Sequence, residues 1–229
     1  MKYRVIAAGL AALCASSLPA LAQEAGPWSV EGRVGAVSDY RDRGYTLSAE
    51  EPVLQGEATL SHASGLYGGV WGSGIEEYGV GPDGDGATVE VTLYAGWAGS
   101  AGGFDIDLGV WSNVYPDGDD VNYVEFPAQI GRTLGDATFS TGVVWAPSQT
   151  GTGDEANTWV WTRAEYAPED WPVSLHAMVG HEDGGFAPDG KTDWRVGVAA
   201  PLGAFTLGVD WVDSDTEDNA VVASVFWGF

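Results

Sequence analysis

The chain has 229 residues, with 33 acidic against nine basic side chains, a formal net charge of −24 and one cysteine, Cys14. A negative field of this size repels nucleic acid and attracts cations, so it argues against a nucleic-acid partner. The lone cysteine excludes an internal disulfide and a metal site made of several cysteines. No later segment is a continuous apolar run of the roughly 20 residues that a membrane helix needs.

Residues Met1–Ala22 have the pattern of a secretory signal peptide. Lys2 and Arg4 form a short basic start, residues 5–15 are an apolar run, and Ala20–Ala22 matches an A-x-A cleavage site. The apolar run is too short for a transmembrane anchor. We therefore expect export with cleavage after Ala22, leaving a single domain over residues 23–229.

Most of that domain consists of short segments in which apolar and polar residues alternate. In the clearest of them, Val89 and Val91 alternate with Glu90 and Thr92, as in a strand with one apolar and one wet face. In residues 66–76 the two faces are equally apolar and cannot be told apart. The expected strands are 28–40, 52–63, 66–76, 88–97, 104–111, 121–132, 139–145, 159–166, 173–179, 193–198, 205–211 and 221–229.

The connections between these strands alternate between short turns and longer acidic loops. The longer loops are 41–51, 77–86, 116–120, 147–156, 183–190 and 213–219. An even number of strands with tight connections on one side is typical of outer-membrane barrels. The sequence therefore predicts an all-β fold, an antiparallel transmembrane barrel of about twelve strands with short periplasmic turns, acidic extracellular loops and both termini on the short-turn side.

A soluble sandwich of twelve strands is the competing structure. It would bury apolar faces against each other, whereas here aromatic residues gather near strand ends, where two interfacial girdles would lie. The residues expected in these girdles are Trp28, Tyr40, Trp97, Phe104, Phe139, Trp145, Tyr166, Trp194, Phe205, Trp211, Trp227 and Phe229.

The last strand carries an assembly signal. Val225, Trp227 and Phe229 share one apolar face, and the chain ends on the aromatic residue. This resembles the C-terminal signature of bacterial outer-membrane barrels, which implies recognition by the barrel assembly machinery. We expect this strand to close the barrel.

Several stretches resemble one family along essentially the whole exported chain. They are V-S-D-Y-R-D-R-G-Y-T-L-S (Val37–Ser48), G-L-Y-G-G-V-W-G-S (Gly65–Ser73), V-E-V-T-L-Y-A-G-W (Val89–Trp97), and Tyr115-Pro116 followed by Tyr123–Glu125. The chain resembles the TorF-type porins, small proteobacterial outer-membrane proteins. The resemblance implies a location in the cell outer membrane, contact with its lipids and lipopolysaccharide, and a porin-like role.

The polar strand faces form the candidate pore lining. Charged side chains in a water-filled pore set ion preference, so an excess of acids favours cations. The alternative is an ion-paired network that fills a narrow barrel. The residues expected to line the pore are Glu31, Arg33, Glu57, Glu90, Asp105, Asp107, Glu125, Arg163, Glu165, Asp193, Arg195 and Asp210.

A second group lies at the end of the first strand and the start of the first loop: Ser38, Asp39, Tyr40, Arg41, Arg43 and Gly44. Its two arginines are the only basic residues among acidic loops, so they are candidates to bind an anionic ligand or a lipopolysaccharide phosphate. The favoured alternative is that they pair with Asp39, Asp42, Glu50 and Glu51 and fold the loop over the rim.

Other chemistry has weak support. The acidic loops lack the spacing of a calcium-binding loop, and we expect no metal, no cofactor and no catalytic residue. His181 faces outward without a serine that can be placed beside it, so a Ser-His pair is disfavoured. Trp111, Trp159 and Trp161 fall on the polar faces, where they either guide solutes or fill space.

We therefore expect a channel for passive diffusion of small hydrophilic, cationic or neutral solutes. The alternative is a closed structural barrel whose acidic loops bind divalent ions, lipopolysaccharide or a partner. The pattern leaves the solute, the pore radius and the oligomeric state open.

Overall fold

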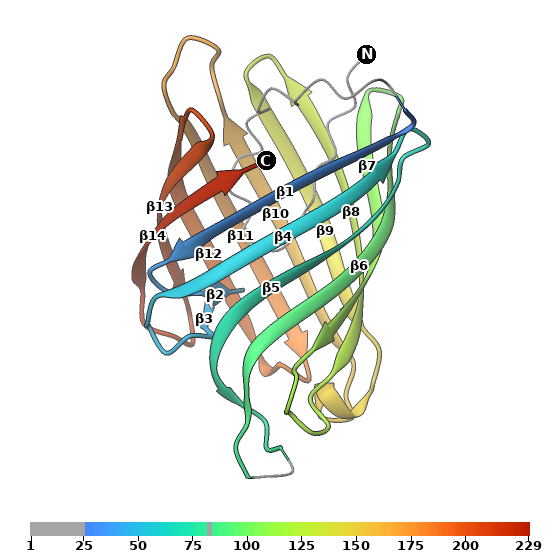
Figure 1. Cartoon of the computed structure of the whole chain (residues 1–229), viewed down its shortest axis with the longest axis vertical. Helices are drawn as coiled ribbons and strands as arrows, with labels where there is room; N and C mark the ends of the chain where they lie inside the picture. The colour runs from blue at the N-terminus through green and yellow to red at the C-terminus, as the bar shows by residue number, and fades with distance from the viewer. Residues whose placement is uncertain (1–25, 82–83) are drawn as a thin grey trace.

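The computed structural model of the chain describes residues 26–81 and 84–229, so the predicted signal peptide lies outside the described residues. These residues form a closed antiparallel barrel in the order β1-β14-β13-β12-β11-β10-β9-β8-β7-β6-β5-β4, with β2 and β3 pairing separately (Figure 1). The prediction of about twelve strands is confirmed. The barrel strands are β1 (Trp28–Val37), β4 (Val53–His62), β5 (Leu66–Tyr78), β6 (Ala87–Ala101), β7 (Phe104–Val114), β8 (Tyr123–Leu134), β9 (Ala137–Ala146), β10 (Asn157–Tyr166), β11 (Ser174–Gly184), β12 (Ala187–Leu202), β13 (Phe205–Ser214) and β14 (Ala220–Gly228).

The barrel closes where the first strand meets the last. β1 pairs with β4 along its whole length and with β14 from Arg33↔Gly228 to Val37↔Ser224. Phe229 extends this seam, since its backbone N–H donates to the Gly32 carbonyl at 2.9 Å and its carbonyl accepts from Gly32 at 3.0 Å. The prediction that the terminal strand closes the barrel is confirmed.

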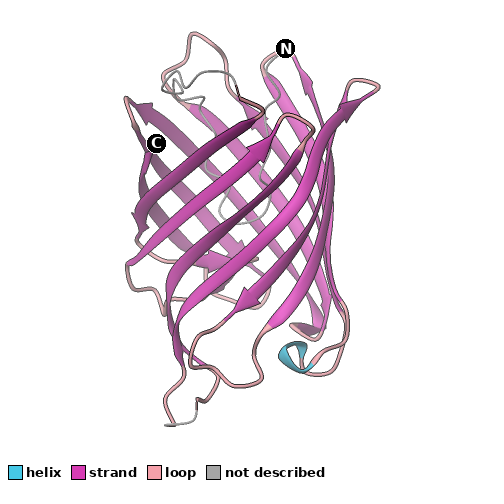
Figure 2. Ribbon diagram, turned by 45° about the vertical axis from the view of Figure 1, so that its right-hand side comes forward, coloured by secondary structure: helices cyan, strands magenta, loops and turns pink. Residues whose placement is uncertain are grey.

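The two ends of the barrel differ as predicted. The start of β1 and the end of β14 lie at the end that carries the short turns, and the longer connections gather at the opposite end (Figure 1). A short 3-10 helix, η1 (Thr150–Thr152), lies in one of these longer loops (Figure 2). Within the described residues, no helix is both long and apolar enough to cross a membrane.

The apolar side chains point away from the barrel axis, as the alternation predicted. Leu54, Val70, Leu108 and Val209 are between 41% and 72% exposed on the outer surface. In β5, where the pattern was undecided, Leu66 and Val70 face outward and Trp71 is buried inside.

Two expectations about local structure were wrong. Tyr40, expected in an aromatic girdle, is 2% exposed inside the barrel, where its hydroxyl bonds to Glu90. Residues 183–190, expected to form a loop, lie almost entirely in β11 and β12, which leave only Gly185 and Phe186 between them. The three glycines, two aspartates and one proline of this stretch are typical of a loop, and they concealed its strands.

The outer face gives a direct test of the membrane interpretation. Val209 lies at the middle of β13, between Val198 and Ala223, and is 47% exposed. We expect Val209→Arg to lower the free energy of unfolding in lipid by about 2–4 kcal/mol, because a charge at mid-bilayer depth is costly. Urea titration in vesicles measures this, with Val209→Ala as the control. Equal stability of the two variants would mean that this face contacts water.

Candidate functional site: a hairpin inside the barrel

The first long loop turns into the barrel and forms a small hairpin. β2 (Arg41–Asp42) pairs with β3 (Tyr45–Thr46) in antiparallel register. The two turn residues have positive φ, 48° at Arg43 and 89° at Gly44, as a two-residue type I′ turn requires. Glycine adopts this conformation freely, but it is uncommon for a long side chain such as that of Arg43.

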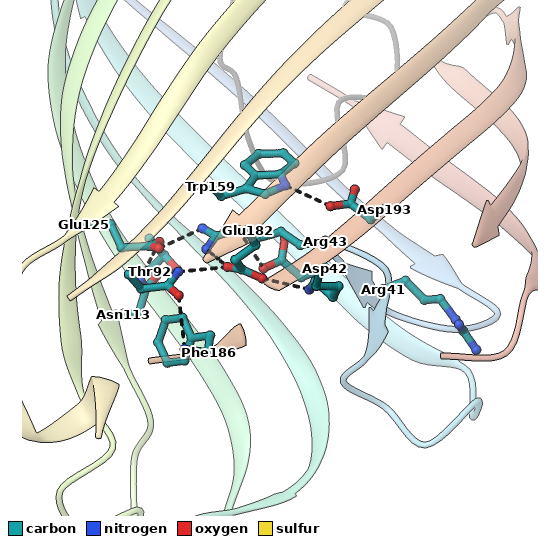
Figure 3. A network of polar contacts seen from close by, with 12 residues as sticks. Arg41, Asp42, Arg43, Thr92, Asn113, Glu125, Trp159, Glu182, Phe186 and Asp193 are labelled. Atoms are coloured by element: carbon teal, nitrogen blue, oxygen red, sulfur yellow. Dashed lines mark hydrogen bonds and ion pairs between the residues drawn. The ribbon is translucent and has the colours of Figure 1, made fainter. Parts of the chain in front are cut away.

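The guanidinium of Arg43 bridges two strands of the barrel wall. Its Nη2 donates to Glu125 Oε1 on β8 at 2.7 Å, and its Nη1 donates to Glu182 Oε1 on β11 at 2.8 Å (Figure 3). The same group lies 5.2 Å from the centre of the Trp159 ring. With both carboxylates almost fully buried, these charge-assisted bonds fasten the hairpin tip to the far wall.

Both carboxylates have further partners. Asn113 donates to Glu125 Oε2 at 3.2 Å, and Asn157 donates to Glu182 Oε1 at 2.9 Å. Lys191 Nζ lies 2.8 Å from Glu182 Oε2. The network therefore spans β7, β8, β10, β11 and β12, and each buried charge in it is compensated.

The base of the hairpin is fixed by a second set of contacts. Arg41 pairs with Asp39 at 2.6 Å and donates to the Asp218 carbonyl at 2.7 Å, while its own carbonyl accepts from Arg195 at 3.1 Å. Beyond Arg41, a cavity of about 20 Å³ separates the hairpin from the wall. That is space for about one water molecule, so the hairpin packs closely on this side.

The groups around Arg43 keep its guanidinium protonated. Burial alone would lower the pKa of its guanidinium, but the carboxylates of Glu125, Asp42 and Glu182 raise that pKa well above its ordinary value. Arg43 therefore stays protonated throughout the accessible pH range, and deprotonation of the arginine cannot be what releases the hairpin.

The predicted rim group is thus correctly identified as a loop group but wrongly positioned. Asp39, Tyr40, Arg41, Arg43 and Gly44 belong to a segment folded into the barrel rather than over its rim, whereas Ser38 continues β1 and is bonded to Ala223 of β14. Arg41 pairs with Asp39 and Glu50 as expected. Arg43 also pairs with Asp42 as expected, at 3.6 Å, but its shortest ion pairs join it to β8 and β11. Neither buried guanidinium is available to a lipopolysaccharide phosphate.

The twelve residues expected to line the pore lie on inward faces but do not form one ring. Glu90, Glu125, Asp193 and Arg195 lie at the level of the hairpin. The other eight lie nearer the short-turn end or elsewhere on the inner face of the wall. They include the pairs Arg33–Glu57 at 2.9 Å and Arg163–Glu165 at 3.3 Å, Asp107 bonded to Tyr67, Asp210 bonded to His176, Asp105 bonded to Ser100, and the exposed Glu31.

Sequence reasoning missed the two asparagines of the network, Asn113 and Asn157, and two of its charged residues, Glu182 and Lys191. Both charged residues fall at the edge of the stretch expected to be a loop. Glu182 continues the inward series of His176, Met178 and Gly180, so extending the period of two beyond the apolar residues would have found it. Lys191 precedes Asp193 on the same face of β12 by the same rule.

The lumen tryptophans are placed as expected. Trp111, Trp159 and Trp161 form a buried cluster with Val144, and partly buried Tyr94 packs against it. Asp83, one of the acidic loop residues, lies outside the described residues. His181 is exposed as predicted, and its Nδ1 lies 3.1 Å from the Thr192 hydroxyl.

The architecture is that of an outer-membrane porin. A solved KdgM porin aligns with a TM-score of 0.61 and 7% identity over 88% of this chain and 99% of the other. KdgM in complex with disordered oligogalacturonate gives 0.62 at the same identity and coverage. An outer-membrane channel from Pseudomonas putida F1 gives 0.51 at 13% identity, over 91% and 97%. At these identities the likeness concerns the fold.

Residues 21–226 match the family model Gcw_chp, described as a bacterial protein of unknown function, and the chain belongs to this family. No curated protein matches the chain significantly. The resemblance to TorF-type porins stays a prediction, because the description of the matched family assigns no function.

The close fit of the hairpin gives a second prediction. A Cβ on Gly44 would lie 2.8 Å from Ser214 Cβ and 3.1 Å from Asp193 Cβ, whereas one on Gly103, at a similar φ of 83°, would meet nothing within 4 Å. We expect Gly44→Ala to displace the hairpin and to speed tryptic cleavage after Arg41 and Arg43 by about tenfold. Gly103→Ala is the matched control. Equal cleavage in both variants would contradict the observed packing.

Proposed function

We propose that this protein is a porin-like channel of the outer membrane that passes small hydrophilic solutes by diffusion, prefers cations and has no enzymatic role. The Ser38–Pro52 segment forms its constriction. The exposed apolar band is proposed to contact membrane lipid, and the strand ending in Val225, Trp227 and Phe229 to engage the assembly machinery. The closed porin-type barrel supports the general role.

The observation that carries the cation preference is the imbalance of buried charge. Among the described residues, seven buried side chains are carboxylates and three are basic, apart from histidine. The carboxylates are Asp39, Glu90, Asp107, Glu125, Glu182, Asp193 and Asp210, and the bases are Arg41, Arg43 and Lys191. An ion in the lumen meets this imbalance at short range and in a medium less polar than water, so a cation is favoured over an anion.

A specific observation also favours the second candidate, a closed structural barrel. The hairpin is fastened at its tip by Arg43 and at its base by Arg41, with both side chains almost fully buried. If those contacts never open, the barrel passes nothing, and its acidic loops become the functional surface. Conductance separates the two functions.

The first experiment is single-channel recording of the exported chain in a planar bilayer under a KCl gradient. We expect discrete current steps and a reversal potential of the sign that K⁺ permeation produces. Glu125→Gln should reduce the preference, and Glu169→Gln, in the turn between β10 and β11, should leave it unchanged. Silence from a folded barrel would exclude the channel, and chloride preference would contradict the electrostatic argument.

The role of the hairpin as a constriction has its own test. Arg43→Ala removes the ion pairs to Glu125 and Glu182, so we expect larger unitary conductance or a higher open probability. Arg132→Ala is the matched control, because Arg132 is exposed and lies over the Phe104 ring at 5.3 Å. If both variants conduct like the wild type, the hairpin does not limit the current.

A further inference from the structure

We propose that the groups around the Arg43 guanidinium, which are Glu125, Glu182 and the Trp159 ring, form a binding site for guanidinium groups. The protein's own arginine occupies this site in the structure, and solutes that carry a guanidinium bind there in exchange. This inference rests on the proposed channel and names the class of solute that its constriction recognises. Arg43 then acts as a tethered competitor inside the lumen.

The geometry around Arg43 matches the chemistry that recognises a planar guanidinium. Glu125 and Glu182 approach different nitrogens, at 2.7 and 2.8 Å, from β8 and β11, which are separated in the wall by β9 and β10. The face of Trp159 supplies a third contact, at 5.2 Å from the ring centre to the guanidinium carbon. The two carboxylates recognise the charge and the forked N–H groups of a guanidinium, and the aromatic ring packs on its flat face.

The site is built without Arg43. Glu125 is held by Asn113, and Glu182 is held by Asn157 and by Lys191. The indole N–H of Trp159 donates to Asp193 Oδ1 at 2.9 Å, which fixes the ring (Figure 3). All of these groups belong to barrel strands whose ladders do not involve the hairpin. When Arg43 leaves, the carboxylates and the ring therefore remain in position for another guanidinium.

Arg43, by contrast, is delivered by a segment that is not part of the barrel wall. It lies in a hairpin of two short strands, and its φ of 48° is unfavourable for a side chain of its size. Withdrawing it breaks its own bonds to Glu125 and Glu182 but no ladder hydrogen bond between barrel strands. Once it leaves, Glu125 has no cationic partner among the described residues and Glu182 keeps only Lys191 of them, so the vacant site is anionic and attracts a cation.

The arrangement also discriminates against simple ammonium ions. A point charge with a single nitrogen cannot reproduce two hydrogen bonds from separate nitrogens to carboxylates on β8 and β11. The neighbouring Lys191 illustrates the difference, since its ammonium pairs with Glu182 alone and lies over the Tyr45 ring at 3.5 Å. We therefore expect the vacant site to favour a guanidinium over an amine of equal length.

The test uses two ligands that differ only in this group, 4-aminobutylguanidine and 1,4-diaminobutane. Binding to the folded, full-length exported chain in detergent is measured by calorimetry, independently of conductance. We expect Arg43→Ala to bind the guanidine at least about tenfold more tightly than the wild type does, and about tenfold more tightly than it binds the diamine. Arg132→Ala should behave as the wild type.

Adding Glu125→Gln to Arg43→Ala should weaken guanidine binding by about tenfold, because one of the two charged acceptors is lost. Arg43→Lys is the second variant. It keeps a charge on the hairpin while losing the fork, and it should also bind the guanidine more tightly than the wild type does. Equal affinity for the two ligands in both Arg43 variants, or indifference to Glu125→Gln, would overturn the site.

The outcome is separable from that of the proposed function. A barrel that binds the guanidine but carries no current supports the site and refutes the channel. A conducting barrel that fails to discriminate the two ligands refutes the site and leaves the channel standing. In a conducting wild-type barrel, 4-aminobutylguanidine should also reduce the current at lower concentration than 1,4-diaminobutane.

Discussion

The structure depends on one constraint, that every backbone N–H and C=O of a strand in hydrocarbon needs a partner within the protein. The closed order of twelve strands meets it, with β1 bonded to both β4 and β14. Closure also creates an interior, and the period of two that directs apolar side chains outward sends every second residue inward. The charged lumen is therefore a consequence of the same alternation that covers the outside of the barrel with apolar side chains.

The hairpin supplies positive charge to this acidic interior. Carboxylates crowded into a narrow space repel one another and lose solvation, and each needs a compensating charge or donor. The wall itself supplies Arg195 and Lys191, and the inward loop supplies Arg41 and Arg43. The inward loop thus supplies part of the electrostatic compensation of the lumen. A mobile cation that replaced Arg43 would pair with the same carboxylates, Glu125 and Glu182. The stability of the hairpin inside the barrel would then depend on which cations the lumen contains.

The pattern of residues was sufficient for the barrel because strand periodicity is a local property. Alternation at residues such as Val89 and Glu90 assigned the faces, turn composition assigned the two ends, and the terminal Phe229 marked the closing strand. The errors occurred where local pattern carries little information. Residues 183–190 are rich in Gly, Asp and Pro and show no alternation, and Tyr40 resembles a girdle aromatic until its loop is seen to enter the lumen.

The sequence by itself therefore determined the class of fold, the strand faces, the placement of the termini and the acidic character of the interior, because each follows from composition or from neighbours a few residues apart. Only the tertiary structure decided where Arg43 goes. Its partners Glu125 and Glu182 are 82 and 139 residues away along the chain, and nothing near residue 43 specifies them. Contacts between such distant residues arise from the curvature and closure of the whole sheet, which brings β8 and β11 to face one inward-folded loop.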